Sequence, residues 1–289
     1  MTVLDPPMAP GGVGVQMIGV VHLYEQGGAD IVALRGVDLD VDPGGMVALL
    51  GPSGMGKSTL LRLLAGLMRS SAGIVRVGDT DLSRLSGSAL QALRAREVSY
   101  VQQDTGRNLL PFATARQNVW FAQQGGRRRG RSPRDPGDLL GQLGLAAVAH
   151  RRVAELPRGM QQQVALAAGV AVSPRLLLVD EPTSQLDSRA SAEVVALLKS
   201  INEQLGTTIV LVTHDPSVAG AFPRTLTIRD GRVGSEGRQG EQFAVVDGAG
   251  SIQLPPDVVE RYPPQTRLRV VRHEDRIELR PLDPDGKPS

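Results

Sequence analysis

The sequence of 289 residues contains no cysteine and only four histidines, which are widely separated: His22, His150, His214 and His273. Without cysteine, a disulfide framework and thiolate metal sites are excluded, and the scattered histidines argue against a zinc cluster. The formal net charge of +2 is no electrostatic footprint for nucleic acid. Basic residues gather in the run 127–134, but its glycine and proline content is typical of a solvated loop.

Long apolar runs are also missing. The longest ones, such as MVALL and RLLLV, fall far short of the roughly 20 residues that span a bilayer. The first 12 residues carry an acid and prolines but no basic start followed by an apolar core, so we expect no secretory signal. With 41% apolar and 21% charged residues, the composition predicts a soluble, cytoplasmic globular protein with one large domain and a small one, or with two domains.

The segment VALLGPSGMGKSTLLRLLAGL, residues 47–67, joins an expected buried strand to an expected helix through a glycine-rich loop. The loop satisfies the P-loop pattern. Glycines let the backbone N–H groups curl around a phosphate, and the helix N-terminus adds positive potential. Lys57 would contact the outer phosphates, and the Ser58 hydroxyl would ligate Mg²⁺. The residues expected to bind ATP in this segment are Gly51, Ser53, Gly54, Gly56, Lys57, Ser58 and Thr59.

A second segment, RLLLVDEPTSQLD, places two acids after a continuous apolar run at 176–179. Such a run is typical of a central parallel strand that is covered on both faces. Ligands of open parallel sheets bind at the carboxyl ends of the strands, so we expect both acids beside the P-loop. Asp180 would hold Mg²⁺, and Glu181 would orient or deprotonate the attacking water. The alternative is a strand end closed by solvated acids, with Pro182 breaking the strand.

These segments resemble the nucleotide-binding subunits of ABC transporters, over about residues 15–237. VSYVQQD looks like the family's glutamine loop, SQLD like the loop that crosses the dimer interface at Asp187, and VLVTHD like its switch strand. The resemblance implies that Gln103 touches Mg²⁺ and senses a membrane partner, and that His214 contacts the γ-phosphate. It also implies that Tyr24 stacks on adenine.

The implied fold is an α/β P-loop NTPase cassette. It has a parallel sheet core, an antiparallel β subdomain and a helical subdomain over about 104–173. The phrases YEQGGADIVALRGVDLDVDPGG and NLLPFATARQNV look like the small ATPases of lipoprotein-release, macrolide-export and cell-division type permeases. The family docks a permease helix near the second phrase, and we expect Leu109, Leu110 and Phe112 to be exposed there and to suit such a groove; packing in a satellite core is the alternative.

The segment LPRGM, residues 156–160, stands where the family has its signature LSGGQ, which faces the ATP bound on the other subunit of a head-to-tail dimer. Pro157 offers neither the hydroxyl nor the N–H of the family serine. Arg158 adds bulk where a glycine lets the backbone approach a phosphate, although its guanidinium could restore some charge stabilisation. Gly159 keeps the family's glycine. Gln163 replaces the arginine that usually follows the family's paired glutamines. Harmless drift at a tolerant position is the alternative interpretation.

We therefore hypothesise that the site formed by a partner's P-loop and this signature is impaired, whereas this chain's own P-loop and Glu181 are competent. The implied partners are integral-membrane permease subunits and a second ABC ATPase subunit, with a slight preference for a heterodimer over a homodimer. The protein would lie on the inner face of the membrane through its permease. The transported substrate is not encoded in these motifs.

The pattern of residues 242–282 predicts a hairpin, a short helix starting at Pro256 and a second hairpin. We expect flexible ends, at residues 1–14 before the cassette and at residues 283–289 after this unit. About forty residues bury little core alone, so we expect this unit to pack on the ATPase or on a second copy. VDGAGSIQLP is similar to the first hairpin of the AbrB-like swapped-hairpin module. The turn has no basic residue, which favours a dimerisation clamp over DNA binding.

Two function classes remain open at this point. The first is an ATPase motor that drives a membrane permease. The second is an ATP-controlled regulatory or DNA-binding protein that uses the C-terminal module, an alternative kept open by its arginines: Arg267, Arg269, Arg272, Arg276 and Arg280. A soluble ABC protein of DNA repair or translation fits poorly, because there is one cassette and no long coiled coil. The coupling-type segment and the uncharged turn favour the motor.

Overall fold

The computed structural model describes residues 11–26, 29–130, 132–238, 241–246, 250, 252, 254, 258, 261–263 and 265–281. The chain divides into two compact units, Met1–Ile252 and Gln253–Ser289. Among the described residues, no helix is long and apolar enough to cross a membrane. The ends of the chain, which we expected to be flexible, lie mostly outside the described residues.

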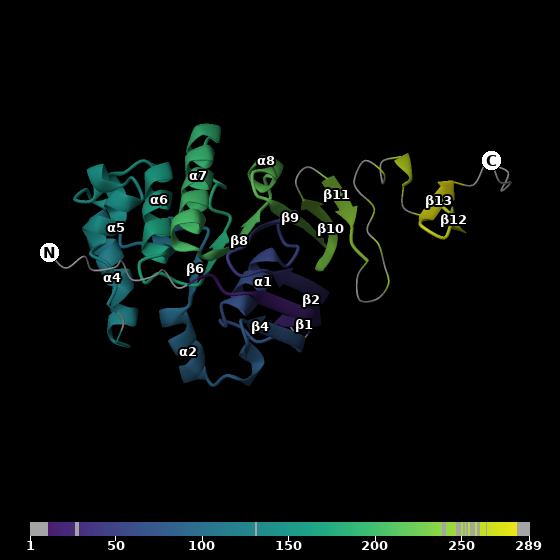
Figure 1. Cartoon of the computed structure of the whole chain (residues 1–289), viewed down its shortest axis with the longest axis horizontal. Helices are drawn as coiled ribbons and strands as arrows, with labels where there is room; N and C mark the ends of the chain where they lie inside the picture. Colours follow the sequence, from purple (N-terminus) through teal and green to yellow (C-terminus); the bar gives the residue numbers. More distant parts are fainter. Residues whose placement is uncertain are drawn as a thin grey trace. The chain divides into compact units, whose positions relative to one another are not determined.

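A seven-stranded sheet forms the centre of the first unit, in the order β11-β10-β9-β3-β8-β7-β6 (Figure 1). Five neighbouring strands are parallel: β3 (Met46–Leu50), β6 (Val98–Val101), β7 (Leu176–Asp180), β8 (Thr208–Thr213) and β9 (Arg224–Arg229). Two antiparallel strands extend one edge: β10 (Arg232–Arg238) and β11 (Glu241–Ala244). The parallel core expected from the apolar runs is therefore confirmed.

A second, four-stranded sheet has the order β2-β1-β4-β5 and is antiparallel throughout. Its strands are β1 (Val15–Gln26), β2 (Ala29–Val41), β4 (Ala72–Val77) and β5 (Thr80–Asp81). This sheet is the expected antiparallel β subdomain. It carries Tyr24 near the end of β1, so that the side chain expected to stack on adenine comes from a different layer than the P-loop.

Helices cover both faces of the large sheet, because alternate side chains of β7 enter two separate cores. Leu176 and Leu178 pack in one core with α1 (Lys57–Leu64). Leu177 and Val179 pack in the other core with α6 (Arg158–Gly169) and α7 (Ser188–Leu205). All five residues of β7 are buried, which confirms the central strand that the apolar run predicted.

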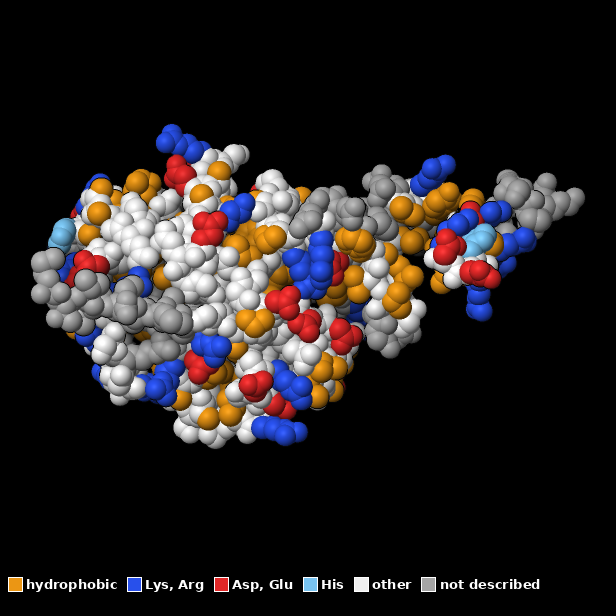
Figure 2. Space-filling view, viewed as in Figure 1, with side chains coloured by type: hydrophobic (Ala, Val, Ile, Leu, Met, Phe, Trp, Pro, Cys, Tyr) orange, Lys and Arg blue, Asp and Glu red, His pale blue; other side chains and the backbone are white. Residues whose placement is uncertain are grey.

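The remaining helices flank these cores (Figure 1). α2 (Gly87–Arg96) and α8 (Pro216–Gly220) accompany the sheet, whereas α4 (Ala115–Arg127) and α5 (Pro136–Gln142) gather with α6 in the helical subdomain. The short helix α3 (Thr105–Asn108) also contacts α6. The part of the chain that the structure describes also has three short 3-10 helices, at Leu82–Arg84, Ala146–Val148 and Val153–Glu155. On the face shown in Figure 2, acidic and basic side chains of the described residues are interspersed.

The apolar segment before α4 corrects one expectation. Leu109 is 5% exposed and belongs to the core of the helical subdomain, so its predicted exposure is wrong and the satellite-core alternative applies to it. The backbone turns back at Leu110, whose N–H donates to Asn118 Oδ1 over 2.6 Å. Phe112 is 74% exposed as expected, and Trp120 and Phe121 are exposed nearby.

The first strand of the predicted C-terminal domain does not belong to a separate domain. Phe243 lies in β11, which pairs with β10 and so belongs to the large sheet, and the first unit extends to Ile252. Val246 and Ile252 form one antiparallel bridge, as expected for a hairpin. In the second unit, β12 (Leu268–Arg272) pairs with β13 (Ile277–Pro281) around the turn 273–276, as the alternating pattern predicted. The helix expected at Pro256 falls mainly outside the described residues.

Candidate functional site

The loop between β3 and α1 requires glycine at positions where the backbone is tightly turned or closely packed. Gly56 has φ of 85°, and a Cβ there would lie 2.4 Å from the Ala33 carbonyl oxygen. A Cβ on Gly51 would lie 2.3 Å from the Ile228 carbonyl oxygen. Gly54 also has a positive φ, of 83°. The glycines thus permit the curled backbone that a phosphate-binding loop needs.

Lys57 is buried at the start of α1 and lies across this loop. Its Nζ donates to the carbonyl oxygens of Gly51 (2.5 Å) and Pro52 (2.8 Å), and lies 3.7 Å from Glu181 Oε1. Burial lowers the pKa of Lys57, although the carboxylates of Glu181 and Asp180 act in the opposite direction. A buried ammonium held mainly by carbonyl groups is well suited to an additional anionic partner such as a phosphate.

Asp180 ends β7 next to the second residue of α1. Ser58 Oγ donates to Asp180 Oδ1 over 3.0 Å, and the Tyr100 hydroxyl donates to Asp180 Oδ2 over 2.8 Å. Hydroxyl and carboxylate oxygens are the hard ligands that Mg²⁺ prefers, usually with phosphate and water completing the shell. Among the described residues, no group of three or more His, Cys, Asp or Glu side chains is arranged to hold a metal ion.

Glu181 leaves β7 in a left-handed conformation, with φ of 46°, and is buried. Its N–H donates to the Val212 carbonyl oxygen over 2.9 Å, so the turn lies across the end of β8. Glu181 Oε2 lies 2.8 Å from His214 Nδ1 and accepts from the His214 N–H over 3.3 Å. A strained non-glycine backbone held in this way is a frequent property of functional sites. It brings the predicted base against the predicted γ-phosphate ligand.

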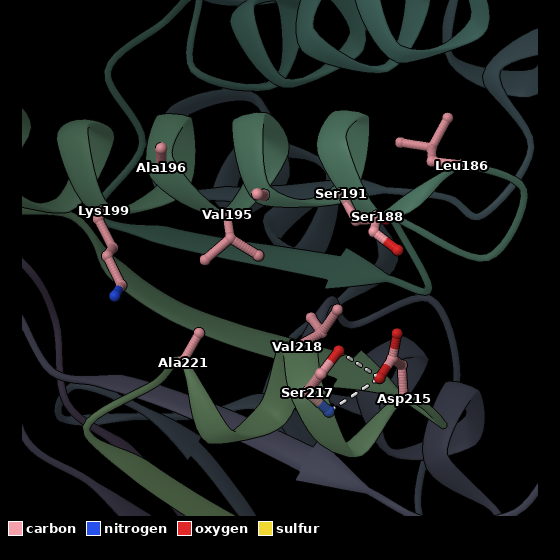
Figure 3. Close-up of a pocket in the computed structure, with 11 residues that line it drawn as sticks. Leu186, Ser188, Ser191, Val195, Ala196, Lys199, Asp215, Ser217, Val218 and Ala221 are labelled. Atoms are coloured by element: carbon pink, nitrogen blue, oxygen red, sulfur yellow. Dashed lines mark hydrogen bonds between the residues drawn. The ribbon is translucent and has the colours of Figure 1, made fainter.

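The loop that carries His214 is fixed by its neighbour Asp215. The Asp215 N–H donates to Thr213 Oγ1 over 3.0 Å, and Asp215 Oδ1 accepts from the N–H (2.8 Å) and Oγ (2.7 Å) of Ser217 (Figure 3). The hydrogen bonds from Ser217 lower the pKa of Asp215.

Between α8 and the facing side of α7 lies a pocket of about 350 Å³, which includes Ser188, Ser191 and Lys199. None of our expected ATP contacts lies in it.

The glutamine loop lies close to the loop before α7. Gln103 is exposed, and its Nε2 donates to Ser184 Oγ over 3.3 Å. Asp187 caps α7, since its Oδ1 accepts from the Ala190 N–H over 2.8 Å. The structure therefore connects Gln103 to the predicted dimer loop rather than to Asp180 directly. It gives Asp187 a local capping role, which leaves the proposed role at an interface untested.

Tyr24 reaches the P-loop helix from the antiparallel sheet. Its hydroxyl lies 3.0 Å from Thr59 Oγ1, and its ring packs edge-to-face on His22 with centroids 4.8 Å apart. His22 is buried, and neither ring nitrogen has a hydrogen-bond partner among the described residues. Tyr24 is therefore next to the candidate nucleotide site, while adenine stacking remains a prediction.

The signature segment begins α6 with few polar groups. α6 starts at Arg158, and Pro157 caps it without a side-chain hydrogen bond. Arg158 Nη1 donates to Gln185 Oε1 over 2.6 Å, and Gln163 Nε2 donates to Glu193 Oε2 over 3.3 Å. At Gly159 a Cβ would lie 3.0 Å from Ala190 Cβ, so this glycine allows close packing of α6 on α7. The helix is intact, as expected.

Sequence reasoning missed one polar residue of the site, Tyr100. Tyr100 pairs with Leu178 in the parallel register of β6 and β7, so its side chain lies on the same face of the sheet as Asp180 two positions later. Burial first of all, and then the Asp180 carboxylate, raise the pKa of Tyr100 well above its usual range, so the hydroxyl is a hydrogen-bond donor. The available signal was an aromatic hydroxyl near the end of a strand beside β7.

Comparisons with known proteins agree with this geometry. A family model described as "ABC transporter" matches residues 34–184. The lipoprotein-releasing system ATP-binding protein LolD of Anaeromyxobacter dehalogenans is 43% identical over 227 residues, which cover 77% of this chain and 93% of that protein. The macrolide export ATP-binding/permease protein MacB of Sodalis glossinidius is 40% identical, but the match covers 78% of this chain and only 34% of MacB.

Solved structures of ABC cassettes have the same fold. The dimeric structure of the bacterial ABC transporter cassette MJ0796 has a TM-score of 0.68 at 32% identity and covers 78% of this chain and 98% of that chain. Its post-hydrolysis state, bound to ADP and Pi, has a TM-score of 0.66 at 33% identity. The matches confirm the P-loop NTPase cassette expected from the motifs. The chain belongs to the ABC transporter family, as an ATP-hydrolysing cassette of the LolD and MacB type that uses ATP with Mg²⁺.

Proposed function

We propose that this chain is the ATPase subunit of a transporter whose membrane permease is a separate polypeptide, and that it works at the inner face of the membrane. The observation that carries the proposal is the convergence of Lys57, Glu181 and His214 at the carboxyl ends of β3, β7 and β8. The match to LolD over nearly the whole length of that ATP-binding protein supports a separate permease.

The proposed roles of the site residues are those that the motifs indicate. The P-loop from Gly51 to Thr59 would hold the phosphates, and Tyr24 would stack on adenine. Ser58, Asp180 and Gln103 would hold Mg²⁺, whose charge would offset that of the phosphate oxygens. Nucleotide binding would thus be divided between α1, the end of β7, the loop after β6 and the antiparallel sheet.

The chemistry of hydrolysis centres on the two oxygens of Glu181. His214 holds Oε2 at 2.8 Å and thereby orients the carboxylate, whereas Oε1 lies 3.7 Å from Lys57 Nζ. When Lys57 contacts a phosphate, Oε1 is free to accept the proton of the attacking water. Burial of the carboxylate keeps it in one orientation and limits competing water.

The proposal includes a weak contribution from the signature to the partner's ATP. Pro157 has no N–H to donate, and the Arg158 guanidinium is engaged with Gln185 on the same chain. Only Gly159 and the N-terminus of α6 are left to contact a γ-phosphate in a head-to-tail dimer. A chain with its own Glu181 and a poor signature is what one half of an asymmetric pair would have, so we favour a heterodimer.

The permease would dock on the exposed apolar residues of the helical subdomain. Phe112 is 74%, Trp120 52% and Phe121 58% exposed. Single exposed apolar residues need no explanation, but three large aromatic side chains within ten positions are characteristic of an interaction surface. Leu109 is not part of this surface, because it is buried.

The second unit would act as a dimerisation clamp of the AbrB-like type. Val270 and Leu279 are paired across β12 and β13, as are Arg272 and Ile277, so these residues share one face of the hairpin. An isolated two-stranded hairpin is marginal in water, and an exposed apolar face of this kind would be covered by a second copy. The opposite face carries the pair Arg269 and Arg280, which is the observation that supports the DNA-binding alternative.

Two experiments test the proposal. Copurification of the tagged chain with membrane proteins should recover a permease, whereas recovery of DNA alone would favour the regulatory alternative. Removal of residues 253–289 leaves β11 and the large sheet complete and should weaken association, as measured by light scattering. An unchanged dimer together with lost DNA retention would reverse the assignment of the second unit.

A further inference from the structure

The buried side of the candidate Mg²⁺ site contains a tyrosine that contacts the metal-binding carboxylate but would not contact the metal. Tyr100 lies on β6, next to β7, and packs against the core that contains α1. Its hydroxyl donates to Asp180 Oδ2 over 2.8 Å, whereas Ser58 Oγ donates to Asp180 Oδ1 over 3.0 Å. Each oxygen of the carboxylate therefore has its own hydroxyl donor, and the two donors come from different elements, α1 and β6.

Arg62 of α1 adds a positive charge near this tyrosine. Burial acts to lower the pKa of Arg62, but Tyr100 and Tyr24 act in the opposite direction and raise it. The buried surroundings of Asp180 therefore include a cation as well as the Tyr100 hydroxyl that donates to it.

We propose that Tyr100 is a positioning residue for Mg²⁺: its hydroxyl fixes Asp180 so that Oδ1 stays directed at Ser58 and the P-loop. This inference rests on the proposed function of the site. Without the hydroxyl, the carboxylate would be free to rotate about χ2, because only Ser58 would hold it. Loss of such an outer partner typically weakens metal binding by about 10- to 100-fold.

The test uses the full-length chain and its Tyr100→Phe variant, which removes one oxygen and keeps the ring in the core. Binding of a non-hydrolysable ATP analogue is measured by calorimetry in EDTA and over a Mg²⁺ titration. We expect the Mg²⁺ concentration for half-maximal binding to rise about tenfold, while affinity in EDTA stays within about twofold. At saturating Mg²⁺, kcat should recover to within about threefold of the unaltered chain.

Tyr262→Phe, in the second unit beside Arg261, is the matched control and should leave the Mg²⁺ dependence unchanged. An unshifted Mg²⁺ titration for Tyr100→Phe would overturn the inference, as would equal losses of affinity with and without Mg²⁺, which indicate a structural defect. If the unaltered chain itself shows no Mg²⁺-dependent binding, the proposed function of the site fails instead. The two failures are thus distinguishable.

Discussion

The starts of α1 and α6 are both helix N-termini that follow short loops, yet their surroundings differ in kind. At α1, Lys57 is buried on main-chain carbonyls and Ser58 is bonded to Asp180. At α6, Pro157 gives no side-chain cap and Arg158 is bonded to the exposed Gln185. A helix can therefore keep its geometry while the groups that would contact a phosphate are lost. The fold and the chemistry at these two positions are separable.

The largest effect is expected at the α1 side, from Glu181→Gln. The amide cannot accept a proton from water, so hydrolysis should fall by about 100-fold or more, while ATP binding is retained. An assay of phosphate release measures hydrolysis, and a nucleotide-binding assay measures ATP affinity separately. Glu193→Gln is the control, because Glu193 is an exposed carboxylate on α7 and should leave the rate unchanged. A similar fall in the hydrolysis rate of both variants would contradict the role of Glu181 as the base.

Replacing a P-loop glycine that the backbone requires should lower the free energy of unfolding. Gly56→Ala would place Cβ 2.4 Å from the Ala33 carbonyl oxygen at φ of 85°, and should cost about 2 kcal/mol or more through strain and overlap. Gly54→Ala has a similar φ, 83°, but no atom within 4 Å of the added Cβ, so it isolates the strain. Thermal denaturation compares them, and equal losses would show that close packing at Gly56 is not important.

A restored signature should raise activity. Pro157→Ser with Arg158→Gly returns the hydroxyl and the backbone N–H that a γ-phosphate would contact. One such hydrogen bond to a charged group is worth about 1.5 kcal/mol, so we expect about a tenfold higher rate of ATP hydrolysis in the self-associated chain. A rate at or below that of the unaltered chain would favour harmless drift at these positions.

The smallest effect is expected from Gln185→Ala. The bond to Arg158 is exposed, so the free energy of unfolding should change by no more than about 0.5 kcal/mol. The freed guanidinium could then reach a partner's phosphate, and hydrolysis should change by less than about threefold. A larger gain would show that Arg158 compensates for Pro157 once it is released.

Local patterns were sufficient to predict the P-loop, the buried β7 and the β12–β13 hairpin, because glycine requirements and side-chain periodicity are properties of short segments. Contacts between distant segments were not predictable in this way. Leu109 is buried because Asn118 turns the backbone back at Leu110. The left-handed turn at Glu181 depends on its bond to Val212.

The C-terminal segment illustrates the same limit. Phe243 has the alternating environment of a hairpin strand, and the sequence predicts it as the start of a small domain. The structure pairs β11 with β10 instead, because an antiparallel edge of the large sheet was available to it. Which edge a strand joins depends on the whole sheet, and a pattern of alternation contains no information about that choice.

The central claim is that this chain supplies a competent phosphate side and a deficient signature, and a mixing experiment tests it most directly. A chain with Pro157→Ser, Arg158→Gly and Glu181→Gln should be inactive alone, yet it offers a restored signature to the P-loop and Glu181 of an unaltered partner. We predict that adding it to the unaltered chain raises ATP hydrolysis, whereas the Glu181→Gln single variant does not. An equal or lower rate in both mixtures would contradict the claim.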